Sequence, residues 1–427
     1  MRAHVVPTLV SFFVFVSCAA TNSTENVSTY AASQQTASRY QFEVVARYAV
    51  PRGCRFSSPA KGAISTGFDR ISLDILCKSK TSGWGGDSQK VVLNSDDLSV
   101  VRYFEDVAGL VCKGPRLEHL PGDRFILACA EADKFGEGGS AAGGGRVELK
   151  IVDYSKPEIS SVKSTILASD DLPGFHIHAL NVDDDGNAFV GYSKTPAGLG
   201  HRVSEFGTAA INFSENGLRD LHWPLSVEAR WCDGTRLCSC DDVLLTPQKD
   251  WLLLCSLRFT QSIQYVRVER SRDGDWQLNS VVPADQFFSS QSGEISGGKY
   301  FKYFDKMGRS AGKDRLVVRD VETMRLLASR FRIRMDDTDS NIAGIAPLEN
   351  GRTLAILSDH TGSVRVALLG GDTLEDRAVF SWKQVLGKAR LAKDQIPFAL
   401  IPADRENSFF LVSRKEIYRV VLTKETE

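Results

Sequence analysis

The sequence has no excess of charge of either sign: its 427 residues include 52 lysines and arginines against 53 aspartates and glutamates. Nucleic-acid-binding chains usually carry a clear basic excess, so the composition argues against a nucleic-acid partner. Long apolar runs are also missing after the N-terminus, and none approaches the roughly 18 residues that a membrane helix requires. We therefore expect no direct membrane span.

Catalytic and metal-binding motifs are scarce as well. The seven histidines are scattered, with no nucleophile elbow and no zinc-protease helix around them. His176 and His178 lie two residues apart, on one face of an expected strand, but no third ligand accompanies them. The acidic segments 183–187 and 336–341 lack EF-hand spacing, and we interpret them as a hairpin turn and a solvated loop between blades. We predict no catalytic residue, no cofactor and no metal.

The N-terminus has the composition of an export signal. An apolar run over residues 5–17 follows Arg2 and ends in the small residues Cys18, Ala19 and Ala20, which predicts a signal peptide over residues 1–20. The alternative is a bacterial lipoprotein signal with an acylated Cys18. Residues 21–39 are polar and are expected to be a disordered tail. The mature chain is therefore predicted to be secreted or extracellular, possessing candidate glycosylation sites at Asn22, Asn26 and Asn212.

Eight cysteines follow the signal peptide: Cys54, Cys77, Cys112, Cys129, Cys232, Cys238, Cys240 and Cys255. An even number in an exported chain favours disulfides over free thiols. Zinc is the competing interpretation for the closely spaced Cys232, Cys238 and Cys240, although no second Cys/His pair lies nearby.

Two stretches of the chain are near copies of each other. Residues 112–129 and 238–255 both begin and end with cysteine, with a proline in tenth place and an aromatic residue in fourteenth place. Strand signals recur along the whole chain, and residues 342–383 contain four expected strands joined by Asn-Gly and Thr-Gly turns. Four strands in about 45 residues is typical of one β-propeller blade.

The sequence thus predicts an all-β propeller over residues 40–423, with seven four-stranded blades, or six if the fifth is an insertion. Residues 397–423 supply only three strands, so residues 40–50 are expected to add the fourth and close the ring. The paired cysteines would then lie on neighbouring strands within a blade. We expect Cys54–Cys77 and Cys112–Cys129 disulfides, with the pairing among the remaining four cysteines left open.

Long glycine-rich loops connect the second and third strands of several expected blades, at residues 78–89, 131–145 and 194–207. Propeller topology places these loops on one face, together with the acidic loop at 336–341. Aromatic and arginine side chains dominate binding hot spots, so the candidate binding residues are Trp84, Phe135, His201, Arg202 and Phe206. The alternative is that the loops are floppy insertions without a binding role.

Ser-x-Asp/Asn patterns recur between third and fourth strands, at residues 95–97, 214–217 and 271–276, and resemble the Asp box of sialidase-like propellers. That box is a structural turn. The arginine cluster of a sialidase is not recognisable, since its FRIR sequence appears only late, at 331–334. With its export signal and blade cysteines, the chain is similar in architecture to the cysteine-rich propeller subunits of apicomplexan host-cell invasion complexes, of the cysteine-rich protective antigen type.

That family has six blades, and the resemblance extends to architecture over most of the chain. It implies a non-catalytic adhesion or invasion protein that binds membrane-anchored or other secreted subunits. Two alternatives remain at this point: a glycosidase or lyase on a sialidase-like propeller, and a bacterial envelope lipoprotein that scaffolds a complex.

Overall fold

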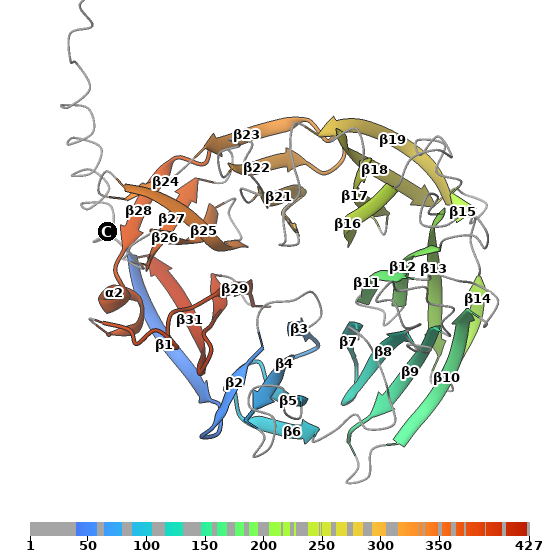
Figure 1. Cartoon of the computed structure of the whole chain (residues 1–427), viewed down its shortest axis with the longest axis horizontal. Helices are drawn as coiled ribbons and strands as arrows, with labels where there is room; N and C mark the ends of the chain where they lie inside the picture. The colour runs from blue at the N-terminus through green and yellow to red at the C-terminus, as the bar shows by residue number, and fades with distance from the viewer. Residues whose placement is uncertain are drawn as a thin grey trace, which may run out of the picture.

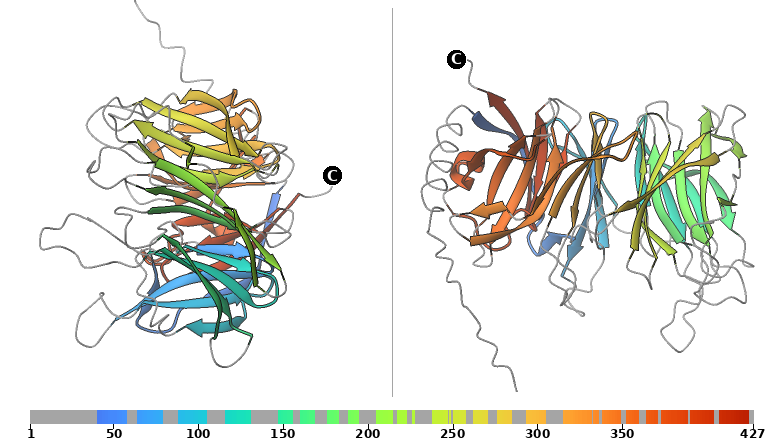
Figure 2. Two further views of the ribbon diagram at one scale, coloured as in Figure 1. Left: turned by 90° about the vertical axis from the view of Figure 1, so that its right-hand side faces the viewer. Right: turned by 90° about the horizontal axis from the view of Figure 1, so that it is seen from above.

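The computed structural model describes residues 40–57, 64–78, 88–104, 116–130, 147–155, 160–168, 176–182, 188–194, 205–214, 217–222, 226–227, 238–246, 248, 250–257, 262–270, 276–284, 293–304, 315–331, 333–335, 338–348, 352–359, 364–370, 373–388, 390–403 and 407–424. These residues form seven antiparallel sheets of four or five strands, arranged in a ring about a central axis (Figure 1). Figure 2 shows the sheets standing side by side when the ring is viewed from its edge. The fold is an all-β propeller, as the sequence predicts.

In the six sheets other than the closing one, the main strands are hydrogen-bonded to one another in the order in which they occur along the chain. In the first three blades they are β2 (Cys54–Phe56), β3 (Ile64–Gly67), β4 (Arg70–Cys77), β5 (Ser88–Asn94) and β6 (Val100–Phe104); β7 (Arg116–Leu120), β8 (Arg124–Ala130), β9 (Val147–Asp153) and β10 (Ser160–Ala168); and β11 (His176–Val182), β12 (Ala188–Lys194), β13 (Glu205–Ser214), β14 (Gly217–His222) and β15 (Ser226–Val227).

In the next three blades they are β16 (Cys238–Leu245), β17 (Trp251–Leu257), β18 (Ser262–Arg270) and β19 (Trp276–Ala284); β20 (Glu294–Ser296), β21 (Lys299–Phe304), β22 (Arg315–Asp320) and β23 (Leu326–Phe331); and β24 (Ile333–Met335), β25 (Thr338–Pro347), β26 (Arg352–Asp359), β27 (Val364–Gly370) and β28 (Asp376–Phe380). The closing blade contains β29 (Ala399–Pro402), β30 (Ser408–Val412), β31 (Glu416–Lys424) and β1 (Tyr40–Ala49).

The ring is closed by its first strand, which confirms the predicted closure. β1 pairs antiparallel with β31 from Tyr40 opposite Lys424 to Ala49 opposite Glu416. Phe42 of β1 packs edge-on against Phe380 of the preceding blade, with ring centroids 4.6 Å apart. The strand is therefore held by backbone hydrogen bonds to its own blade and by aromatic packing against its neighbour.

The hydrophobic core lies between the faces of neighbouring blades. One cluster joins the closing blade to the blade before it, including Leu354, Phe380 and Tyr418, and another joins it to the first blade, including Ile71 and Phe410. The middle strand β30 is buried at every position, which explains the continuous apolar run from Phe409 to Val412.

The outermost strand of each of the seven sheets contains a β-bulge. The bulge residues, each without a partner on the third strand, are Val45, Val101, Val162, Asp220, Asn279, Leu327 and Arg377, with a second bulge in β10 at Leu167. A bulge bends a strand and increases its twist. Such edges pair poorly with the edge of another sheet, which protects the rim of the ring from aggregation.

Arginines link successive blades in a repeated pattern. Arg267 donates from Nη1 to the Glu322 carbonyl oxygen at 2.9 Å, and Arg330 donates from Nη1 to the Leu374 carbonyl oxygen at 2.8 Å. Four further pairs cross between blades in the same direction: Arg70 to Asp123, Arg102 to Tyr154, Arg352 to Asn407, and Arg419 to Asp96. Each arginine donates a hydrogen bond to an oxygen in a turn of the next blade. Neighbouring blades are therefore held together by polar contacts as well as by packing.

Three turns between third and fourth strands share a six-residue form. In each of them the fifth residue is apolar, buried and left-handed: Leu98, Met324 and Leu374 have φ values of 56°, 54° and 55°. Each donates its backbone N–H to the carbonyl oxygen four residues earlier. The predicted corner at residues 95–97 belongs to this form, with an apolar side chain packed beneath a polar turn.

Two local expectations differ from the structure. The strand expected over residues 376–382 ends at Phe380 instead, and the short helix α2 (Trp382–Leu386) follows it and buries Trp382, Val385 and Leu386 at helical spacing. Part of the expected acidic loop at 336–341 belongs to a hairpin, because β25 begins at Thr338 and pairs with β24. No helix in the described part of the chain is long and apolar enough to cross a membrane.

Candidate binding surface at the closing seam

Three connections meet where the closing blade adjoins the first blade, and we call this region the closing seam: residues 47–57, 388–396 and 413–416. Backbone bonds join the first of these connections to the third, since Val50 N donates to Lys415 O at 3.0 Å and Phe56 N donates to Arg414 O at 2.8 Å. The connection at 388–396 contacts them through side chains. All three lie on the face that carries the loops between second and third strands.

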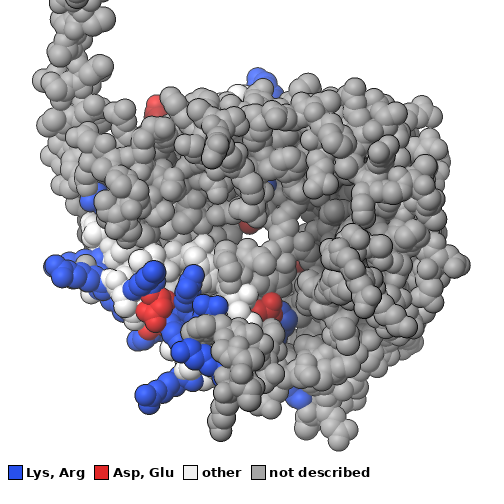
Figure 3. Space-filling view, in the orientation of Figure 1, with Lys and Arg blue, Asp and Glu red and all other residues white. Residues whose placement is uncertain are grey.

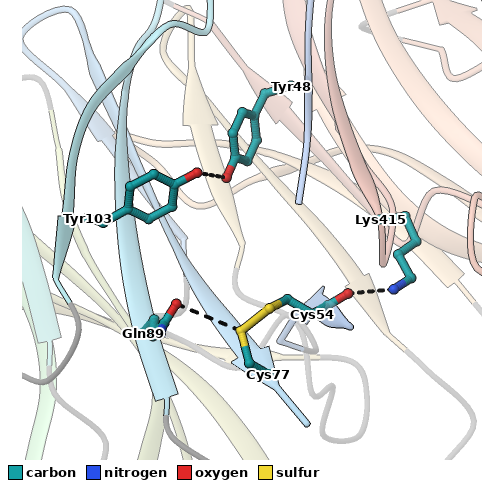
Figure 4. The surroundings of a disulfide bond; sticks show 6 residues. All are labelled: Tyr48, Cys54, Cys77, Gln89, Tyr103 and Lys415. Atoms are coloured by element: carbon teal, nitrogen blue, oxygen red, sulfur yellow. Dashed lines mark hydrogen bonds between the residues drawn. A yellow bond between two sulfur atoms is a disulfide. The ribbon is translucent and has the colours of Figure 1, made fainter. Parts of the chain in front are cut away.

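A disulfide and a lysine fix the first blade at this seam. Cys54 of β2 lies directly opposite Cys77 of β4, and the two form the disulfide expected from the sequence. Figure 4 shows the Lys415 ammonium group donating to the Cys54 carbonyl oxygen, and Gln89 beside the Cys77 sulfur. The start of the first blade is thus tied covalently to β4 and by a charged donor to the closing blade.

A buried carboxylate organises the cations around it. Glu416, whose side chain is 4% exposed, accepts hydrogen bonds from Arg47, from Lys388 Nζ at 3.1 Å, from Gln395 Nε2 at 3.3 Å and from the Tyr418 hydroxyl. Burial by itself would raise the pKa of Glu416, but the bonds from Tyr418, Lys388 and Arg47 outweigh it and lower the pKa. Glu416 therefore stays ionised and holds all three connections in place.

Four exposed cations surround this buried centre, and we call them the cationic patch: Arg52, Arg390, Lys393 and Arg414. Their side chains make no hydrogen bond or ion pair with other described residues. Figure 3 shows Lys and Arg gathered on this face, over the closing and first blades. The three connections contain eight lysines and arginines against two acids, one of which is the buried Glu416. A strong positive field is expected here despite the nearly neutral chain.

Exposed valines lie on the adjacent outer rim, and we call them the valine strip: Val44, Val45, Val100 and Val101. They are 37% to 44% exposed, on the outermost strands β1 and β6 of the two neighbouring blades, and each pair includes a bulge residue. The Tyr48 and Tyr103 hydroxyl oxygens are 2.6 Å apart and link the two strands (Figure 4). Burial, followed by this hydrogen bond, raises the pKa of Tyr48.

Between the first and second blades the structure buries charged and titratable groups. His119 of β7 is 1% exposed, and neither ring nitrogen has a hydrogen-bond partner among the described residues. Lys90 is also buried and pairs with Asp74 at 2.5 Å. Burial, together with the nearby positive charges of Lys90 and Arg70, lowers the pKa of His119 to about 3. His119 is thus a neutral core side chain at physiological pH.

Most of the residues predicted to bind lie outside the described part of the chain: Trp84, Phe135, His201 and Arg202, together with Asn22 and Asn26. Phe206 is in β13 opposite Ser193, and Asn212 is in the same strand opposite Arg219. His176 and His178 fall in β11, as expected for a strand.

The remaining cysteines are placed only in part. Cys112 and Cys232 lie outside the described residues, and Cys129 is in β8. In the fourth blade, Cys240 of β16 lies directly opposite Cys255 of β17, whereas Cys238 lies opposite Leu257. The expectation that blade cysteines occupy neighbouring strands therefore holds for the backbone of this blade.

Sequence reasoning missed the cationic patch. Its signal is present as local runs, with three arginines in residues 47–55 and three basic residues in 388–393, but these runs are more than 300 residues apart. The total charge conceals them. Chemically, the cationic patch offers fixed cations and the adjacent valine strip offers exposed apolar side chains, two surfaces suited to binding. The described residues contain no group of three His, Cys, Asp or Glu side chains positioned to hold a metal ion.

No family model and no curated protein matches this chain. Solved structures with a similar fold include the polysaccharide lyase Uly1, at 8% identity over 90% of this chain and 100% of that chain, with a TM-score of 0.48. An ulvan lyase from a new polysaccharide lyase family matches at 9% identity over 90% and 96% of the two chains, with a TM-score of 0.45. Sqt1 of Saccharomyces cerevisiae matches at 9% identity over 85% and 97%, with a TM-score of 0.43. At identities this low, the likeness concerns the fold alone.

Proposed function

We propose that this chain is a secreted, non-catalytic propeller that binds a protein partner through the valine strip, as a subunit of an extracellular or cell-surface adhesion or host-invasion complex. Its partners are membrane-anchored or other secreted subunits. The export signal and the blade cysteines support the location, and the resemblance to invasion-complex propellers supports the role.

The exposed valine strip is the observation that carries this proposal. Apolar side chains on the outer strands of two adjacent blades leave a surface that gains free energy when a partner covers it, at about 25 cal/mol for each Å² removed from water. Tyr103, 39% exposed, lies beside the valines and supplies the aromatic group that is common at interface hot spots. The bulges in β1 and β6 make strand addition unfavourable, so the partner is expected to contact side chains.

The test is purification of the tagged chain from its native cells in mild detergent, followed by quantitative mass spectrometry. A double variant, Val44→Ser with Val101→Ser, is compared with the control Leu326→Ser, which removes another exposed apolar side chain from an outer strand of a distant blade. We expect a stoichiometric partner with the wild type and the control, and its loss with the double variant.

Recovery of the same partner with all three proteins would refute binding through the valine strip. A chain that is recovered alone and hydrolyses or cleaves glycans would favour the enzyme alternative. Mass spectrometry of the mature N-terminus adds a second check, because a free end near Thr21 is expected, whereas a lipid on Cys18 would favour the bacterial lipoprotein alternative.

A further inference from the structure

We infer that the cationic patch is a separate binding site for a sulfated polysaccharide. Arg52, Arg390, Lys393 and Arg414 are exposed, and no described residue neutralises them. This site uses different side chains from the valine strip and does not depend on the proposed protein partner.

The cationic patch is prearranged because hydrogen bonds with buried groups hold the three segments that carry it. Val50 and Phe56 bond to the backbone of the 413–416 turn, and the buried Glu416 accepts from Lys388 and Gln395 of the 388–396 connection. The backbone positions of the four exposed cations are therefore fixed before any ligand arrives. Prearranged positions reduce the entropy that must be lost when a ligand binds.

The chemistry of the patch selects an anionic ligand with several charges. Three of the four side chains are arginines, whose planar guanidinium groups donate two parallel hydrogen bonds to sulfate, phosphate or carboxylate oxygens. The four cations come from three separate connections. A polymer that carries a charge on each repeating unit can contact several at once.

Surrounding side chains favour a polysaccharide over a protein or a nucleic acid. None of the large exposed apolar residues of the described chain lies in the three connections, whereas protein interfaces depend on apolar and aromatic anchors. No exposed aromatic side chain is described in these connections either, and single-stranded nucleic acids are held largely by base stacking on aromatic rings. Sulfate groups on a sugar chain need only the cations that the patch supplies.

The experiment measures binding of heparin to the full chain by calorimetry over a series of salt concentrations. The patch variant carries Arg52→Gln and Arg414→Gln. The control carries Arg124→Gln and Arg325→Gln, which lose the same charge from turns on the opposite face. We expect at least tenfold weaker binding by the patch variant, with a shallower salt dependence, and less than a twofold change for the control.

Circular dichroism and thermal unfolding check that both variants are folded. Absence of heparin binding by the wild type, or equal losses in both variants, would overturn the site. Hyaluronan, which carries carboxylates without sulfates, is expected to bind more weakly than heparin; equal affinity would overturn the assignment to sulfate. Tighter patch-dependent binding of polyglutamate or DNA would replace the polysaccharide with that class of ligand.

Discussion

Arg419 of the closing blade and Asp96 of the first blade are joined, although 323 positions separate them in sequence: Arg419 Nη1 lies 2.7 Å from both the carboxylate and the carbonyl oxygen of Asp96. The arginine side chain is 6% exposed, and its Nε also donates to the Ser408 hydroxyl at 3.2 Å. This contact continues the series of arginine bonds between successive blades, because it joins the last blade to the first.

We predict that Arg419→Ala lowers the free energy of unfolding by about 1 to 3 kcal/mol, the usual range for losing buried hydrogen bonds to a charged group. The partly exposed Asp96 can be rehydrated, which keeps the loss below that of a fully buried ion pair. Denaturant unfolding measures the change. Arg414→Ala, an exposed arginine of the same blade, is the control and should stay within about 0.5 kcal/mol of the wild type.

Because His119 is buried in its neutral form, we predict that the folded chain becomes less stable in mild acid. His119 has a pKa of about 3 in the folded chain, whereas an unfolded histidine has its ordinary value near 6.5. The unfolded state therefore binds a proton that the folded state does not, and stability falls as the pH drops below about 6.5, by up to about 1.4 kcal/mol per pH unit. Unfolding curves of His119→Gln between pH 8 and 4 should show a smaller decline than the wild type. Parallel curves throughout would show that His119 does not titrate in this way.

The buried carboxylate predicts a second, more acidic transition. Because the pKa of Glu416 is lowered in the folded chain, its contribution to stability is present above the ordinary carboxyl value of about 4.3 and is lost as the pH falls below it. Glu416→Gln should be less stable than the wild type at pH 7, and the difference should shrink below about pH 4. A difference that stays constant across this range would contradict the role given to the ionised Glu416.

The fourth blade predicts a specific pair of cysteines. Cys240 faces Cys255 across β16 and β17, the same cross-strand relation that Cys54 and Cys77 have in the first blade. We expect a Cys240–Cys255 disulfide, which leaves Cys232 to pair with Cys238. Peptide mapping without reduction identifies the linked fragments. A fragment that joins Cys238 to Cys255 would show that the backbone register does not decide the pairing.

Much of this fold could be predicted from the sequence because its signals are local. Alternating apolar residues and Asn-Gly or Thr-Gly turns mark the hairpins of residues 342–383, and the orphan strand at 40–50 indicated how the ring closes. The arginine pattern was also available: Arg70 to Asp123, Arg102 to Tyr154, and Arg267 to Glu322 each span 52 to 55 residues.

The binding surface could not be predicted in the same way, because it exists only after the ring has closed. Arg52 and Arg414 belong to opposite ends of the chain, and nothing local relates them. Helix α2 has only 5 residues, too few for a helical spacing of apolar residues to be recognised in the sequence. Its clearer signals are at its ends, where Ser381 N donates to the Gln384 side chain at 2.8 Å and Gly387 adopts a left-handed conformation with a φ of 69°.

The pairing of β1 with β31 has a consequence for synthesis. A ribosome makes Tyr40 long before its partner Lys424, so β1 emerges well ahead of the strand that holds it. The middle blades contain their own strands and are able to form in order as they appear, whereas closure waits until β31 has been made. A product that ends before residue 413 therefore lacks Arg414, Glu416 and the whole of β31, so interrupted translation should leave the ring open.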